Sequence, residues 1–147
     1  MHLIPRLAWS LLSCLPMTAA LAETNSQLAL RHQCSEAFFT QIEVKACLEK
    51  ALTSSTQALQ KAEAAMEQAL KNWDQDPRYI QTARKHLKAA HREFMEYRSQ
   101  QCSLLSAING GAAGNAFELR RLACTAELNN RRAAQLQEVV QEIVSAQ

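Results

Sequence analysis

Apolar residues recur every three or four positions along most of the chain, which is the spacing of one face of an α-helix. The longest stripe consists of Ile80, Ala83, Leu87, Ala90, Phe94, Tyr97, Gln101 and Leu104. A second contains Leu59, Ala62, Met66, Ala69 and Trp73, and a third contains Leu119, Leu122, Ala126, Asn129, Ala133, Leu136, Val140 and Ile143. Each stripe predicts a long amphipathic helix that buries this face against other helices.

Helix breakers are rare and set the boundaries of these helices. After residue 22 the only proline is Pro77, and the only glycines are Gly110, Gly111 and Gly114. Good helix formers dominate the remaining positions, and runs of β-branched residues are absent. The expected long helices cover approximately residues 41–73, 77–106 and 116–145.

Helix starts are marked by capping residues. Thr40 and Glu43 fit a capping box, and the segment Asn115–Glu118 resembles another. Asp76 can cap a helix whose first residue is Pro77. A short helix, about Gln27 to Phe38, should precede the long ones, with Phe38 and Phe39 filling the core. Long helices on short turns pack antiparallel. We therefore predict an all-α fold, an antiparallel bundle of three long helices plus a short N-terminal helix.

The N-terminus has the layout of a secretory signal peptide. Met1–Arg6 carries a positive charge, Leu7–Ala19 is mostly apolar, and Ala20–Ala22 fits a cleavage site. We expect a signal peptide over residues 1–22, cleavage near Ala22, and one helical domain over residues 23–147, placed in the periplasm or secreted.

Lipidation is the alternative for this segment. Leu11–Cys14 loosely resembles a lipoprotein cleavage site, which would leave Cys14 lipidated. Leu12 fits that site poorly, and the residues after Cys14 stay apolar instead of forming a polar tether. We therefore do not expect a membrane anchor.

Four cysteines follow the signal segment: Cys34, Cys47, Cys102 and Cys124. An even number in a secreted chain favours two disulfides. Three connectivities are possible, and sequence proximity favours Cys34–Cys47 with Cys102–Cys124. The second bridge would join the two helices that flank the glycine loop into a hairpin.

Charge and motif content narrow the function. Removal of residues 1–22 takes away Arg6, which leaves 15 of the 16 basic side chains against 14 acidic ones. A nearly neutral chain gives no electrostatic case for nucleic acid or an anionic membrane. The histidines and carboxylates show neither metal-ligand nor catalytic spacing. We expect no enzymatic activity, no cofactor and no metal.

Two polar residues stand within the apolar stripes or beside them. Asn129 is an amide in an apolar stripe, and we expect it to pair with a polar group across the interface. Arg98 lies four residues before Cys102. Its structural interpretation is that the stem packs on the core and the guanidinium pairs with Glu118 or Glu127. Its functional interpretation is a contact with a partner.

A longer motif connects these residues to a known family. It reads Phe94-x-x-Tyr97-Arg98-x-x-x-Cys102, a Gly-Gly loop, then Cys124-x-x-x-Leu128-Asn129-x-x-Arg132-x-x-x-Leu136. Together with the earlier pair Cys34 and Cys47, this pattern resembles the LprI-type lysozyme-inhibitor family. The resemblance spans about Cys34 to Leu136. It implies a secreted, non-enzymatic protein whose partner is a lysozyme.

The glycine loop is the candidate contact with that partner: Asn109, Gly110, Gly111, Gly114 and Asn115. Its small side chains could enter a cleft, and a Cys102–Cys124 bridge would limit the entropy lost on binding. Lysozymes are commonly basic, however, and the loop carries no acid.

A periplasmic structural or protein-interaction module without lysozyme inhibition is the alternative function. It would leave an apolar patch exposed on a helix face. The sequence does not specify the partner or the oligomeric state.

Overall fold

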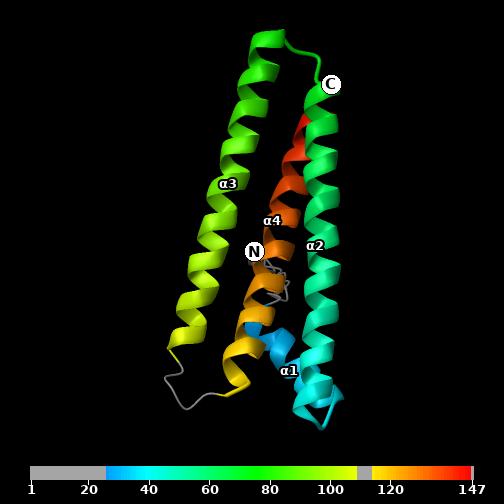
Figure 1. Ribbon diagram of the computed structural model, residues 1–147. Helices are drawn as coiled ribbons and strands as arrows, with labels where there is room; N and C mark the ends of the chain where they lie inside the picture. Colours follow the sequence, from blue (N-terminus) through cyan, green and yellow to red (C-terminus); the bar gives the residue numbers. More distant parts are fainter. Residues whose placement is uncertain (1–25, 109–113, 147) are drawn as a thin grey trace, which may run out of the picture.

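The computed structural model describes residues 26–108 and 114–146, which form four α-helices (Figure 1). No strand occurs among these residues. The all-α prediction is confirmed, and the helix boundaries differ from the expected ones by a residue at most. The expected signal peptide, residues 1–22, lies outside the described residues. The helices are α1 Gln27–Ala37, α2 Gln41–Asn72, α3 Pro77–Ala107 and α4 Ala116–Ser145.

Three of the four helices begin with a side-chain cap. The Ser26 hydroxyl accepts from the Ala29 amide at 3.1 Å, and the Asp76 carboxylate accepts from the Arg78 amide at 2.8 Å. Thr40 and Glu43 form the expected capping box. Asn115 makes no side-chain cap bond. The expected second capping box is therefore wrong, and Glu118 pairs with Arg121 instead.

α4 contacts each of the other three helices, and it runs antiparallel to α3 but parallel to α2 (Figure 1). The α2–α4 interface is the most extensive, and it buries Leu59, Ala62, Met66 and Leu70 of α2. The ten buried residues of α4 are Leu119, Leu122, Ala123, Cys124, Ala126, Glu127, Leu128, Asn129, Ala133 and Leu136. These two helices form the core of the molecule.

The third long helix lies against one side of that core. α3 packs mainly on α4 and touches α2 only lightly, and its buried residues are Cys102 and Ser106. Three residues of the expected stripe, Ala90, Tyr97 and Leu104, are exposed instead. A helix with essentially one neighbour buries a narrower arc than its apolar stripe offers, so the outer edge of the stripe faces solvent.

Two disulfides tie the helices together with the connectivity favoured by proximity. Cys34–Cys47 joins α1 to α2 with a Cα–Cα distance of 5.8 Å, and Cys102–Cys124 joins α3 to α4 with 5.6 Å. Both lie towards the same end of the bundle, where α2 and α4 begin and α3 ends (Figure 1). We call this the stapled end. The opposite end, with the α2–α3 turn and the C-terminus of α4, carries no disulfide among the described residues.

Hydropathy gives the helices no membrane-spanning character. Within residues 26–108 and 114–146, no helix is long and apolar enough to cross a membrane.

Candidate functional site

A polar cluster connects the three long helices halfway along the bundle. Asn129 of α4 is 0 % exposed. Its amide nitrogen donates to the hydroxyls of Ser55 and Thr56 on α2, both at 3.3 Å, and its carbonyl accepts from the Arg98 guanidinium on α3. Asn129 therefore pairs across both of its interfaces, as the sequence predicts, and it fixes the register of α4 against its neighbours.

The sequence did not identify these hydroxyls as the partners of Asn129. Ser55 and Thr56 also donate to the Leu52 carbonyl at 2.9 and 2.8 Å, so both are bonded within α2 and available as acceptors for Asn129. The available signal was a run of four hydroxyl residues, Thr53 to Thr56, in a segment otherwise made of good helix formers.

Arg98 stacks as well as hydrogen-bonds. Its guanidinium carbon lies 5.6 Å from the centroid of the Phe94 ring, and that of Arg132 lies 5.9 Å from the same ring. Both distances suit a cation–π contact. Burial lowers the pKa of the Arg98 guanidinium from its ordinary value, and the negative charge of Glu63 acts in the opposite direction.

The expected carboxylate partner of Arg98 is wrong. Glu118 pairs with Arg121 at 2.8 Å, and Glu127 pairs with Arg131. Position 118 is eleven residues before Asn129, about 16 Å along the helix, and position 127 points about 200° away from it. Neither carboxylate can reach the place where Arg98 meets α4.

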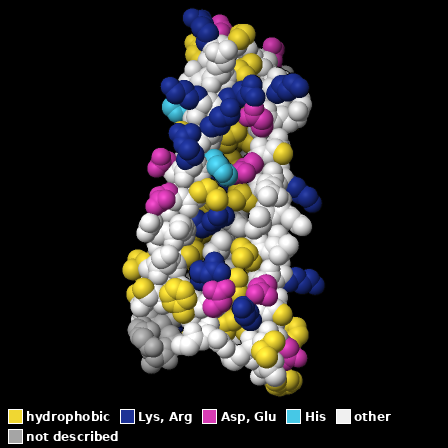
Figure 2. Space-filling view, in the orientation of Figure 1, with side chains coloured by type: hydrophobic (Ala, Val, Ile, Leu, Met, Phe, Trp, Pro, Cys, Tyr) yellow, Lys and Arg dark blue, Asp and Glu magenta, His cyan; other side chains and the backbone are white. Residues whose placement is uncertain are grey.

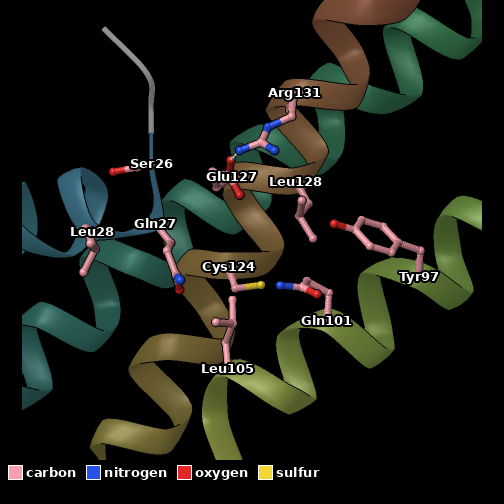
Figure 3. A pocket seen from close by; sticks show the side chains of 10 residues that line it. All are labelled: Ser26, Gln27, Leu28, Tyr97, Gln101, Leu105, Cys124, Glu127, Leu128 and Arg131. Atoms are coloured by element: carbon pink, nitrogen blue, oxygen red, sulfur yellow. Dashed lines mark hydrogen bonds and ion pairs between the residues drawn. The ribbon is translucent and has the colours of Figure 1, made fainter. Parts of the chain in front are cut away.

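A shallow groove follows the seam between α3 and α4 and consists of two adjoining hollows. The first, about 290 Å³, is lined by Ser26, Gln27, Leu28, Tyr97, Gln101, Leu105, Cys124, Glu127, Leu128 and Arg131 (Figure 3). The second, about 260 Å³, is lined by Phe94, Tyr97, Leu128, Arg131, Arg132 and Gln135. Tyr97, Leu128 and Arg131 belong to both. We call the combined depression the α3–α4 groove.

The motif residues gather at this groove. Phe94, Tyr97, Leu128 and Arg132 line it, and Arg98 and Asn129 support it from within. The remaining motif residue, Leu136, does not line the groove. It is buried in the α2–α4 core beside Leu59, Ala62, Met66, Leu70 and Ala133.

The groove combines aromatic, apolar and charged side chains. Tyr97 is half exposed, its ring lies across from Leu128, and the Glu127–Arg131 ion pair forms one wall (Figure 3). All four cysteines of the described residues are in disulfides and cannot act as nucleophiles. No group of three His, Cys, Asp or Glu residues placed to hold a metal occurs in the described part of the chain.

The expected loop site falls mostly outside what the structure describes. Asn109, Gly110 and Gly111 belong to the segment 109–113, which is not described. Gly114 has φ +43°, a backbone conformation that favours glycine, and a Cβ there would meet open space. Gly114 and Asn115 are exposed and lead into α4 at the stapled end.

Two exposed phenylalanines contradict the prediction that they fill the core. Phe38 and Phe39, expected in the core, lie in the connection between α1 and α2 and are 39 % and 102 % exposed. Phe39 precedes the cap Thr40, where an apolar residue often packs against the fourth helical position, here Val44. Val44 is instead buried against Cys34, Leu48 and α4. The short connection leaves Phe39 no route back to the core.

Comparison with known proteins places the chain in a family. The profile of the family described as "Lysozyme inhibitor LprI" matches residues 34–136. No curated protein and no solved structure matches the chain. The matched region starts at the first cysteine of the fold, contains both disulfides and includes both sides of the α3–α4 groove. Because this match covers more than half of the sequence, the chain belongs to the LprI lysozyme-inhibitor family.

Proposed function

We propose that this protein is a non-enzymatic inhibitor that binds a lysozyme in the periplasm or outside the cell. The family match over residues 34–136 carries this proposal. Two disulfides support an oxidising compartment, which agrees with a signal peptide cleaved near Ala22 and a single domain over residues 23–147. The proposal needs no cofactor, no nucleic acid and no membrane anchor.

The mode of inhibition we propose is the rigid presentation of the stapled end to the enzyme. The loop Asn109–Asn115, which contains Gly110 and Gly111, is the first candidate contact. The Cys102–Cys124 bridge supports it, because it holds α3 and α4 together beside this loop. A bridge that restrains the helices on both sides of a loop reduces the conformational entropy lost on binding.

Inhibition of a panel of purified lysozymes by the oxidised protein, residues 23–147, tests the function. We expect inhibition of at least one type, and loss of that inhibition on reduction. No inhibition at micromolar concentration of any enzyme in the panel would refute the proposal.

Bulky substitutions test the loop separately. Gly110→Trp with Gly111→Trp should abolish inhibition while helicity and melting temperature stay unchanged. Gln75→Trp, in the exposed α2–α3 turn at the opposite end, is the matched control. A double variant that still inhibits would exclude the loop as the contact.

A second candidate function rests on a different observation. Tyr97, Leu104 and Ile108 of α3 and its end are 53 %, 58 % and 64 % exposed, at spacings of seven and four residues that place them along one side of the helix. Such an apolar strip favours binding of an envelope protein without lysozyme inhibition. If the wild-type protein captures an envelope protein, Leu104→Lys does not, and neither of them inhibits a lysozyme, this alternative is supported.

A further inference from the structure

The connection between α1 and α2 forms a small apolar projection at the stapled end. It consists of Phe38, Phe39 and Ile42, which are 39 %, 102 % and 82 % exposed. We call these three residues the apex. Figure 2 shows hydrophobic side chains near this lower end of the molecule.

The apex is held rigidly in spite of its exposure. The Cys34–Cys47 disulfide closes the α1–α2 hairpin directly behind it. Cys34, Val44 and Leu48 are buried under it in a cluster with Leu119, Leu122 and Ala123 of α4. The capping box also fixes the turn, because the Glu43 carboxylate accepts from the Thr40 amide at 3.2 Å and from its hydroxyl at 2.7 Å. An exposed aromatic on a fixed backbone loses less entropy on binding than one on a mobile loop, and such residues are common anchors of protein interfaces.

The charged side chains nearest to the apex in the sequence are acidic. Between Gln33 and Val44 the only charged side chains are Glu36 and Glu43. Glu36 is exposed and lies 3.2 Å from His32, and the next base along the chain, Lys45, is paired with Glu49 at 3.6 Å. The apex therefore offers an aromatic surface flanked by two carboxylates, which fits a positively charged partner.

We propose that the apex is the anchor by which this protein docks on its enzyme, with Phe39 entering a concave, apolar site on a basic lysozyme. The proposal rests on the proposed function and adds the contact surface and the charge of the partner. A convex projection of this kind fits a cleft better than a flat surface. Glu36 and Glu43 disfavour the two other occupants of an apolar surface. They would repel an anionic membrane, and in a two-fold dimer they would meet their own copies.

Removal of the Phe39 ring tests the proposal. Phe39→Ala should raise the inhibition constant at least about tenfold for the lysozyme that the wild-type protein inhibits best, which is the usual effect of truncating an aromatic anchor. Tyr79→Ala, an aromatic residue 60 % exposed at the opposite end of the bundle, is the matched control and should stay within about twofold. Circular dichroism and melting should not change in either variant, because neither ring packs in the core.

Charge provides an independent readout. Glu36→Lys should weaken inhibition more at low than at high ionic strength. Normal inhibition by Phe39→Ala would overturn the apex proposal and leave the lysozyme-inhibitor function standing. Failure of the wild-type protein to inhibit any lysozyme would overturn both. A concentration-dependent dimer that Phe39→Ala abolishes would assign the apex to self-association and overturn the docking proposal.

Discussion

At the scale of single residues, Asn129 determines how the three long helices meet. It bonds side chains from both neighbouring helices and is fully buried. Its importance could be predicted, because an amide in an apolar stripe needs a partner. Its partners could not, because the rotation of α2 decides which of Ser54, Ser55 and Thr56 face α4. The expected partner of Arg98 was wrong for a related reason. The sequence does not show which residues of α3 and α4 lie at the same level along the bundle.

Truncation of this amide should destabilise the fold. Asn129→Ala removes the acceptor of the half-buried Arg98 guanidinium and the donor to Ser55 and Thr56, whose hydroxyls keep only their bonds within α2. We expect a loss of about 2–4 kcal/mol in the free energy of unfolding. Urea denaturation followed by circular dichroism measures it. Asn130→Ala, one residue further on the exposed face, is the control and should change stability by less than about 0.5 kcal/mol. Equal stability of the two variants would show that the cluster contributes nothing.

The Glu118–Arg121 pair should give a small acid-dependent contribution to stability. The hydrogen bond from Arg121 holds the pKa of Glu118 below its ordinary value of 4.5. A lowered carboxyl pKa stabilises the fold above the pKa of the unfolded chain, and this contribution is lost as the pH falls through the folded pKa. The pair is partly exposed, so we expect Glu118→Gln to cost under about 1 kcal/mol at pH 7. Unfolding curves of the wild type and of Glu118→Gln at pH 7 and pH 3 check this. The difference in unfolding free energy between the two proteins should shrink at pH 3, and an unchanged difference would contradict the prediction.

At the scale of elements, α3 is the helix whose existence was easiest to predict and whose packing was hardest. Pro77 and the glycine loop define its limits, and its apolar spacing marks it as helical. Amphipathicity does not reveal how many neighbours a helix has, however. Beyond its contact with α4, the first half of α3 is tied to α2 by the Arg84–Glu67 ion pair and by a hydrogen bond between His91 and Glu63. The buried part of α3 is confined to its last turns, around Cys102 and Ser106.

The disulfide at that position should therefore control the mobility of α3. Cys102→Ser with Cys124→Ser should lower stability by about 3 kcal/mol. The pair Cys34→Ser with Cys47→Ser should cost a similar amount, because loops of 22 and 13 residues differ little in closure entropy. Hydrogen exchange should separate the two variants. Amides of α3 should exchange faster only in the Cys102→Ser, Cys124→Ser variant, and amides of α1 only in the Cys34→Ser, Cys47→Ser variant. Uniform acceleration of all helices in both would contradict this division.

At the scale of the whole molecule, side-chain types are distributed unevenly along the long axis. The apex and its two carboxylates lie at the stapled end, and α3 carries no acid from Pro77 to Arg92 towards the opposite end. Arg84, Lys85, Lys88 and Arg92 share an arc of about 100° on that helix. The sequence gives a nearly neutral net charge and so predicts no charged surface. Net charge does not report this uneven placement, because it sums the charges of both ends of the molecule.

The run of basic residues on α3 should affect the rate of association with a basic enzyme. If the apex docks on a basic lysozyme, the positive segment of α3 opposes the approach without touching the enzyme. Lys85→Glu with Lys88→Glu should raise the association rate several-fold at low ionic strength, and the gain should shrink as salt is added. Surface plasmon resonance at two ionic strengths measures it, with Lys85→Gln and Lys88→Gln as an intermediate. A lower rate, or lost inhibition, would show that this part of α3 contacts the partner.

The disulfide pattern has a consequence for the maturation of the protein. Each cysteine of the fold is bonded to its immediate neighbour in order of synthesis, so the two covalent loops neither overlap nor enclose one another. A chain emerging N-terminus first into an oxidising compartment would present Cys34 and Cys47 together long before Cys102 appears. Oxidation in order of appearance then yields the native pairing directly. The yield of correctly oxidised protein should consequently depend on a thiol oxidase and be unaffected when a disulfide isomerase is deleted.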